Sequence, residues 1–494
     1  MTEKNADLLA RTSQSWIDGK AWTGGDKSIP HVNPANGESL GDSQCLQADG
    51  VEAALSSARR AFRGEWGRQD ASRRTARLLA FADIIAANVD ALALLESLEV
   101  GRPLQDARAL VAMAPEFIRR YARMAEVGQG DVTAAHDRLL TFSWRRPRGV
   151  IVAIVPWNFP VMNAIVRVAP ALAAGNAVVL KPSENAPRAA RLLASLASEA
   201  GLPDGVLNVV LGDGPTTGRL LAAHDDVDLV SFTGSTASGL AVSRAAATFR
   251  AKPVILECGG KSPQIMLDDA FDDPAVWPAI FFSSFWNSGQ WCAARTRLLV
   301  PRSRLNAAID GLTQAASAWT LGDPLQASTR LGPLINASQR DRVLEYFHIA
   351  GKEGRVQDLG CAAGDLHPAG LFVRPAIVVE PTRGSRITRE EVFGPLLTVE
   401  TFADVTDAIA LANATDYGLM ASVWTKRSAE AYRFARELDV GCVSVYSSAE
   451  AAMSSMQDFV TSYLEPQKRS GHGVDGGMQG LYAYTTAQSI SLFS

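Results

Sequence analysis

Five short apolar runs between residues 151 and 257 constrain the fold most strongly. They read "IVAIV" at 151–155, "AVVL" at 177–180, "VLNVV" at 206–210, "LVSF" at 229–232 and "PVILE" at 253–257, with alanine-rich stretches between them. Short β-branched runs that alternate with helical stretches predict an α/β fold with a parallel, doubly wound sheet. Because such sheets bind ligands beyond the carboxyl ends of their strands, we expect the functional residues directly after each run.

The length of 494 residues exceeds what one hydrophobic core organises, so a second domain is expected. After Lys261 a second α/β pattern begins, with apolar runs at 298–300, 376–379, 397–402 and 442–446. Residues 50–125 form alanine- and arginine-rich stretches typical of helices that cover the first sheet. We predict a first domain from 1–124 and 148–259, a second from 260–460, and a small β element from 125–147 and 472–494.

Composition and charge indicate a small-molecule protein of a reducing, cytoplasmic compartment. The net charge is -4 without long runs of one sign, which argues against a nucleic-acid partner. The start "MTEKNADLLA" lacks the apolar core of a signal peptide, and the most apolar stretch is broken by polar residues and prolines, which argues against a membrane span. The five cysteines are odd in number and never spaced C-x-x-C, so we expect neither disulfides nor a metal site.

Two motifs after the predicted strands suit a dinucleotide, although no G-x-G-x-x-G follows any strand. In "FTGSTASG", Gly234 allows close backbone approach and Ser235 opens a helix whose free amides favour a pyrophosphate; an ordinary serine N-cap is the alternative. In "KPSE", Lys181 and Glu184 lie where such sheets hold a ribose, and the carboxylate favours NAD over NADP; a solvated charge pair is the alternative.

Six motifs occur together in one order and spacing: "PWNFP", "KPSE", "FTGS", "LECGGK", "NSGQWCAAR" and "EEVFGP". On these motifs the chain resembles the aldehyde dehydrogenase superfamily, in its non-acylating, hydrolytic branch, from about residue 15 to 445. The resemblance implies two doubly wound domains, the first binding NAD and the second catalytic. The alternating stretch "RLLTFSWR" at 138–145 and the tail "LYAYTTAQSISLF" at 481–493 are both predicted to be edge strands that need partners. The resemblance implies that these two segments, in the small β element, join subunits into a homodimer or homotetramer.

The resemblance assigns the chemistry to three residues. Cys292 would attack the aldehyde to form a thiohemiacetal and later a thioester, and Glu257 would activate the water that releases the acid. The side chain of Asn158 and the backbone N–H of Cys292 would bind the oxyanion. Taken singly, these residues could also be a buried thiol, a helix-start carboxylate and a turn residue. Cys258 stands where relatives often have leucine, so we interpret it as a packing residue.

The resemblance also assigns cofactor contacts to Trp157, Lys181, Glu391 and Phe393. NADP is possible but less favoured, because Glu184 would repel its 2′-phosphate. The presence of Glu257 argues against relatives that acylate coenzyme A, since these generally lack that glutamate.

The substrate pocket is expected to be apolar and to contain Phe159, Met162, Trp291 and Phe459. We therefore expect an aromatic or medium-chain aliphatic aldehyde, with a semialdehyde or amino-aldehyde as the alternative. A thiol hydrolase is a rival from another class, but no histidine motif accompanies Cys292. A third alternative is a structural or ligand-carrying protein that has kept the fold but lost turnover. Near the C-terminus, "YLEPQKRSG" and Asp475 depart from the family pattern, which puts the subunit contacts in doubt.

Overall fold

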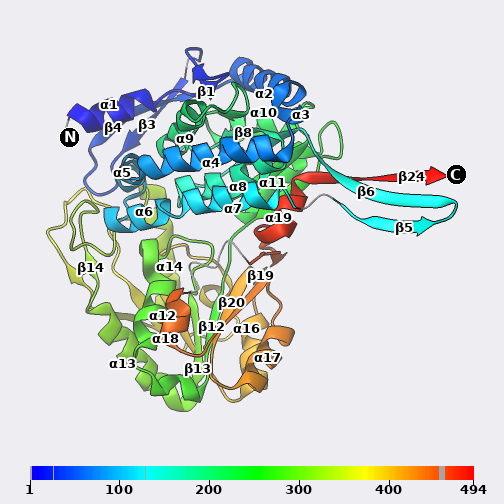
Figure 1. Ribbon diagram of the computed structural model, residues 1–494. Helices are drawn as coiled ribbons and strands as arrows, with labels where there is room; N and C mark the ends of the chain where they lie inside the picture. Colours follow the sequence, from blue (N-terminus) through cyan, green and yellow to red (C-terminus); the bar gives the residue numbers. More distant parts are fainter. Residues whose placement is uncertain (1–2, 26, 128–129, 455–461, 494) are drawn as a thin grey trace.

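The computed structural model describes residues 3–25, 27–127, 130–454 and 462–493 (Figure 1). Its main body contains two large, mostly parallel sheets flanked by helices, and a narrow three-stranded sheet extends away from that body. The expected α/β class with parallel sheets is confirmed. No single helix in the described ranges is long and apolar enough to cross a membrane, although two consecutive helices bent by 64°, α4 (Ala71–Ala87) and α5 (Val89–Val100), together satisfy length and composition.

The first sheet has the five expected strands at its centre, in the order β9-β8-β7-β10-β11 and all parallel. These strands are β7 (Val150–Ile154), β8 (Ala177–Lys181), β9 (Leu207–Val209), β10 (Leu229–Thr233) and β11 (Val254–Glu257). Short antiparallel strands close the edges: β1 (Trp16–Ile17), β2 (Lys20–Ala21) and β23 (Gly471–His472). The chain reverses its strand order between β7 and β10, which is where ligands of such sheets bind.

Side chains of β7 alternate between the two faces of this sheet, so both faces are buried. Val150 and Val152 pack into one hydrophobic cluster with residues of α2, and Ile151 and Ala153 pack into another with α8 and α9. The helices of this half are α2 (Ala48–Arg63), α3 (Glu65–Arg68), α4 (Ala71–Ala87), α5 (Val89–Val100), α6 (Leu104–Val111), α7 (Ala114–Met124), α8 (Pro160–Ala173), α9 (Arg188–Glu199), α10 (Arg219–Ala223) and α11 (Thr236–Ala246). The helices predicted over residues 50–125 are therefore confirmed.

The second sheet has seven strands in the order β15-β17-β18-β13-β12-β20-β21. The four predicted runs correspond to β13 (Arg297–Pro301), β17 (Ala376–Val379), β18 (Leu396–Phe402) and β21 (Cys442–Tyr446). The sequence reading missed β12 (Pro263–Met266), β20 (Met420–Trp424) and the antiparallel edge strand β15 (Arg355–Asp358). Its helices are α12 (Val276–Phe285), α13 (Leu305–Ala316), α14 (Ala337–Glu353), α15 (Arg386–Arg389), α16 (Val405–Asn413), α17 (Ser428–Glu437) and α18 (Ala449–Ser454).

The three-stranded sheet consists of β5 (Val132–His136), β6 (Leu139–Pro147) and β24 (Thr485–Phe493), and it projects from the body in Figure 1. The predicted strand near 138–145 is confirmed. The tail from 481 was also expected to be extended, but its first three residues belong to α19 (Gly477–Ala483), and this part of the expectation was wrong. The tail strand pairs with β6 of the same chain over nine residue pairs, from Thr485↔Pro147 to Phe493↔Leu139.

Candidate active site

Four of the expected motifs meet at one edge of the first sheet. Parallel register places Lys181 beside Ile154 and Glu257 beside Thr233, so the carboxyl ends of four strands are level. The residues that follow these strands, Asn158 after β7 and Ser235 after β10, therefore belong to the same edge. The predicted site residues at the ends of these apolar runs, or directly after them, therefore lie at the carboxyl edge of the sheet, where they were expected.

Cys292 lies between α12 and β13, after a tight left-handed turn. Asn287, Ser288 and Gly289 have φ angles of 54°, 56° and 73°, a conformation that non-glycine residues adopt at a cost. Cys292 itself is half-buried, and the structure contains it as a free thiol. Burial of the sulfur, with smaller contributions from Glu257 and Glu391, raises the pKa of the thiol to about 12, whereas the N–H groups of Ala293 and Cys292 lower it.

Asn158 is buried beside the nucleophile loop. Its Nδ2 donates a hydrogen bond to the carbonyl of Gln290 at 3.1 Å, and its Oδ1 accepts one from Asn163 at 3.1 Å. An amide nitrogen carries two N–H groups, so this geometry fixes the side chain and leaves a second donor. Because Gln290 is two residues before Cys292, the structure brings the two predicted residues together.

Glu257 ends β11 as a buried carboxylate. Its Oε1 has no hydrogen-bond partner in the described part of the chain. Burial raises the pKa of Glu257 well above its usual value, and the carboxylate of Asp475 raises it further, whereas Arg167 lowers it. Buried polar groups are normally paired, so an unpaired carboxylate oxygen near the thiol suits a group that binds water or substrate.

Arg167 and Asp475 are the neighbours of Glu257 that the sequence reading missed. Arg167 lies in α8, forms an ion pair with Asp475, and donates to the hydroxyl of Thr233 at 2.7 Å. In the sequence, Asp475 stands out only as a departure from the family pattern that puts the subunit contacts in doubt. The signal that could have identified Arg167 is a lone cation in the otherwise apolar helix "PVMNAIVRVAPALA", since buried charges are normally paired.

The predicted phosphate and ribose residues have defined local contacts. Ser235 is the N-cap of α11, and its hydroxyl accepts from the N–H of Ser238 at 3.2 Å. Gly234 donates its N–H to the carbonyl of Glu257 at 3.0 Å. Lys181 is buried, lies 3.6 Å from the carboxylate of Glu184, and has a pKa that burial lowers. A serine N-cap is thus present, as the alternative interpretation of Ser235 stated, whereas Lys181 and Glu184 form a charge pair whose lysine is buried and not solvated.

Glu391 and Phe393 reach the same region from the second sheet. Glu391 accepts a hydrogen bond from the N–H of Gly260 at 2.9 Å, and burial raises its pKa to about 7. The ring of Phe393 contacts that of Trp157 edge-on, with centroids 5.4 Å apart. A side chain at Gly260 would place its Cβ 2.7 Å from the carbonyl of Cys292, so the glycine in "LECGGK" is needed for the nucleophile loop to approach.

Aromatic rings form a cluster around Trp286 that includes Trp291, the residue before Cys292. The ring of Phe159 lies 5.4 Å from that of Trp286, and Trp291 contacts Trp286 edge-on at 5.5 Å. Phe282 stacks on Trp286 at 5.3 Å, and Met162 is buried in the same hydrophobic cluster as Phe159. Of the predicted pocket residues, Phe159 and Trp291 both contact Trp286, Met162 is buried in the same large cluster, and Phe459 lies outside the described residues. Trp286 and Phe282 were missed.

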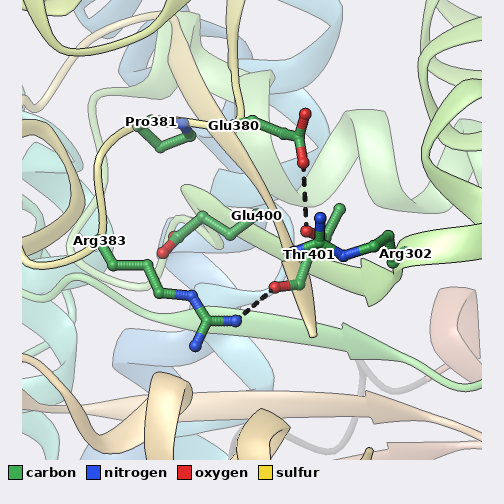
Figure 2. A pocket seen from close by; sticks show the side chains of 6 residues that line it. All are labelled: Arg302, Glu380, Pro381, Arg383, Glu400 and Thr401. Carbon is green, nitrogen blue, oxygen red and sulfur yellow. Dashed lines mark hydrogen bonds between the residues drawn. The ribbon is translucent and has the colours of Figure 1, made fainter. Parts of the chain in front are cut away.

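A separate surface hollow of about 190 Å³ does not belong to this site (Figure 2). In it, Arg383 donates to the carbonyl of Thr401 at 2.8 Å, and the Thr401 hydroxyl donates to Glu380 at 3.3 Å. Glu400, which also lines it, forms a two-bond ion pair with Arg297. None of the predicted site residues lines this hollow, so we assign it no role in the chemistry.

Comparisons with known proteins show the family to which the chain belongs. A model of the aldehyde dehydrogenase family matches residues 22–490. Aminoacetaldehyde dehydrogenase of Pseudomonas aeruginosa is 38% identical over 87% of this chain and 86% of its own length. Among solved structures, betaine aldehyde dehydrogenase of Staphylococcus aureus in complex with NAD+ has a TM-score of 0.91 at 31% identity, covering 99% of this chain and 97% of that one.

A third similar protein is the indole-3-acetaldehyde dehydrogenase AldA of P. syringae, solved as a mutant in complex with NAD+ and IAA. It has a TM-score of 0.91 at 34% identity and covers 99% of both chains. The chain belongs to the aldehyde dehydrogenase family. This confirms the expected class of enzyme, an oxidoreductase that oxidises an aldehyde.

Proposed function

We propose that this chain oxidises an aldehyde to the carboxylic acid with NAD, through a covalent intermediate on Cys292. The observation that carries the proposal is the convergence of the Asn158 amide and the unpaired Glu257 carboxylate on the loop of Cys292. One group can stabilise an oxyanion and the other can activate water, which are the two functions that the reaction needs beside a nucleophile.

In the first step the Cys292 thiol loses its proton to water, its sulfur bonds to the aldehyde carbon, and the C=O π electrons move to the oxygen, giving the thiohemiacetal as an oxyanion. The developing oxyanion lies between the second N–H of the Asn158 amide and the backbone N–H of Cys292. Loss of one such donor lowers the rate on the order of 10²–10³-fold. Because burial raises the thiol pKa to about 12, the free enzyme holds a protonated thiol at neutral pH. A positive charge near the sulfur would favour the thiolate.

The donor set at the strand ends suits a dinucleotide. The N-terminus of α11 offers free N–H groups to a pyrophosphate, Lys181 and Glu184 can hold the adenosine ribose, and Glu391 the other ribose. The rings of Trp157 and Phe393, which contact each other, would line this cofactor site. When bound there, NAD+ would supply a hydride acceptor and a positively charged ring.

In the last step Glu257 takes a proton from water, which attacks the thioester and releases the acid and the thiol. The raised pKa of Glu257 makes it a stronger base than an exposed carboxylate, provided that the pH is high enough to ionise it. A histidine-assisted thiol hydrolase lacks support, because no hydrogen bond joins Cys292 to a histidine in the described residues.

The aromatic rings around Trp286 support an aromatic or medium-chain aliphatic substrate. An amino-aldehyde is the second candidate, because aromatic faces also attract cations and because a 38% identical relative is an aminoacetaldehyde dehydrogenase. The carboxylate that contacts these rings, Asp106, accepts from the Trp286 indole at 3.0 Å, and burial raises the pKa of that carboxyl. It is therefore less suited to pair with a substrate ammonium.

The test is NADH formation with aromatic, aliphatic, amino- and semialdehydes, on the wild type and Cys292→Ala, with NAD and NADP in parallel. We expect the highest kcat/KM with an aromatic or medium-chain aldehyde and NAD, and no turnover by Cys292→Ala. A preference for succinic semialdehyde over benzaldehyde of about 100-fold would reject the substrate proposal. Absence of NADH from every aldehyde would reject the function.

We also propose that the chain is divided into a cofactor domain (1–124 and 148–259), a catalytic domain (260–460) and an oligomerisation element (125–147 and 472–494). The exposed apolar residues on the three-stranded sheet support the last of these: Val132, Leu140, Trp144, Leu492 and Phe493. Its two outer strands, β5 and β24, each have one unpaired edge within the described sheet. These features favour a homodimer or a homotetramer.

A further inference from the structure

A buried ion pair outside the predicted site contacts both the turn that carries Asn158 and the turn that precedes Cys292. Arg102 follows α5, and Glu96 lies within α5; both side chains are 0% exposed. The Arg102 guanidinium donates through Nη1 to Glu96. A buried charge pair contributes little to stability beyond what an apolar pair would, so its particular geometry calls for another explanation.

The pair holds the turn that carries Asn158. Arg102 donates through Nη2 to the main-chain carbonyl of Asn158, and the other carboxylate oxygen of Glu96 accepts from the N–H of Val161 at 2.9 Å. The carbonyl at the start of the turn and the N–H at its end are thus fixed by one ion pair. The guanidinium also lies 4.4 Å above the ring of Phe159, within the same turn.

The same guanidinium contacts the turn that precedes Cys292. Its Nε donates to the side-chain carbonyl of Asn287 at 3.3 Å. The Asn287 amide in turn donates to the carbonyl of Gln290 at 3.1 Å and to that of Asn158 at 3.4 Å. Since Asn287 begins the left-handed turn, Arg102 joins the loop of the oxyanion donor to the loop of the nucleophile.

We infer that Arg102 is a positioning residue, which sets the distance between the Asn158 amide and Cys292 by binding both loops through one rigid guanidinium. This inference rests on the proposed function. A planar guanidinium directs its donors in fixed directions, here to Glu96, Asn158 and Asn287, whereas a lysine ammonium on a flexible stem does not reproduce that arrangement. A shift of about 1 Å in such a site can lower the rate about 10²-fold.

The test compares Arg102→Lys with Arg188→Lys. Arg188 is equally buried and pairs with Glu99 at 2.9 Å, but its other contacts are the carbonyls of Leu40, Gly41 and Asp42, away from the site. We expect Arg102→Lys to lower kcat by about 10- to 100-fold with KM for NAD changed by less than about 2-fold. Arg188→Lys should lower the melting temperature by a similar amount and leave kcat within about 3-fold of the wild type.

A double-mutant cycle separates positioning from general destabilisation. If Arg102 acts through Asn158, then Arg102→Lys should lower kcat by less than about 3-fold in the Asn158→Ala background, because the donor that it positions is gone. The same loss in both backgrounds, or full kcat in Arg102→Lys alone, would overturn the inference. Should Arg102→Lys not fold, Asn287→Gly keeps the left-handed backbone, removes the acceptor, and should lower kcat by about 10-fold; an unchanged kcat would overturn the inference.

The result is distinguishable from failure of the proposed function. Wild-type turnover that Cys292→Ala abolishes establishes the nucleophile independently of Arg102. If Cys292→Ala retains turnover, the proposed function fails, and the inference about Arg102 fails with it. If Cys292→Ala is inactive and the Arg102 cycle is additive, only the positioning role is rejected.

Discussion

Arg167 and Asp475, 308 residues apart in the chain, form a buried ion pair beside Glu257. Asp475 raises the pKa of Glu257 and Arg167 lowers it, on top of the larger increase that burial causes. The pair therefore adjusts the pH range in which Glu257 is ionised and able to accept a proton from water. Either charge can be removed by substitution without altering Glu257 itself.

Asp475→Asn should move the acidic limb of the pH–kcat profile to lower pH, by about one unit. The substitution removes the negative charge and leaves the Arg167 cation, so the pKa of Glu257 falls. A general base works in its ionised form, and activity therefore rises with pH through that pKa. The measurement is kcat from below pH 5 to neutral pH at saturating aldehyde and NAD.

A matched control is Asp90→Asn, which removes one carboxylate of an exposed ion pair with Arg108. It should leave the pH profile unchanged. Loss of the partner of a buried guanidinium also destabilises a protein by about 3–5 kcal/mol, so Asp475→Asn should melt at lower temperature. An acidic limb at the wild-type pH in a folded Asp475→Asn protein would mean that the pair does not act on the base.

The two cysteines near Glu257 should differ sharply when each is replaced by alanine. Cys258 is buried against Phe232 and Leu256, and burial raises its pKa to about 12, as it does for Cys292. Only Cys292 lies on the loop that the Asn158 amide contacts. Cys292→Ala should lower kcat by at least about 10³-fold, and Cys258→Ala by less than about 3-fold with about 1 kcal/mol lost in stability. Equal losses would contradict the assignment of Cys258 as a packing residue.

Local sequence patterns predicted the parts of this fold that local physics determines. The five runs of the first sheet are rich in β-branched residues and bounded by turn residues. Their short apolar pattern and these flanking turn residues therefore identify them as strands. Strand β12 begins with Pro263, a residue depleted in strands, and β20 reads "MASVW" without a clear boundary. The last tail residues alternate as a strand does, but the preceding "GMQGLYA" forms a helix, and no proline or cap marks the boundary.

For the site, the sequence indicated residues that stand in motifs but not those defined by contacts between distant segments. The motifs "NSGQWCAAR", "PWNFP" and "LECGGK" indicated Cys292, Asn158 and Glu257. The site also includes residues that no motif marks, because only the fold brings them next to their partners: Arg167, Asp475 and Trp286. One sequence contains no information about which segments meet, except where a charge in an apolar helix requires an unseen partner.

His31 should make stability depend on pH on the acidic side. It is buried, its Nε2 lies 2.7 Å from the Ser43 hydroxyl, and burial together with the Arg188 cation lowers its pKa to about 4. Between pH 6.5 and about 4 the unfolded chain binds more protons than the folded one, so stability that is present above pH 6.5 is lost as the pH falls through that range. The loss is on the order of 2–3 kcal/mol.

The measurement is the melting temperature at neutral pH and near pH 4.5, for the wild type and His31→Gln. The variant has no titrating group at this position, so its decrease in melting temperature should be smaller. His136→Gln, a change at an exposed histidine of β5, is the control and should behave as the wild type. An identical decrease in His31→Gln and wild type would show that other groups determine the acid sensitivity.

Assembly should depend on the apolar surface of the three-stranded sheet. Trp144 on β6 is 48% exposed, and Phe493 at the end of β24 is 80% exposed, which is unusual for such large apolar side chains in a sheet with unpaired edges. Trp144→Glu places a charge on this surface and should reduce the mass measured by light scattering towards the monomer value of 52.7 kDa. Leu344→Glu makes the same kind of change at a 47% exposed leucine of α14 and should leave the mass unchanged. A wild type that is already monomeric, or a Trp144→Glu protein of wild-type mass, would place subunit contacts elsewhere.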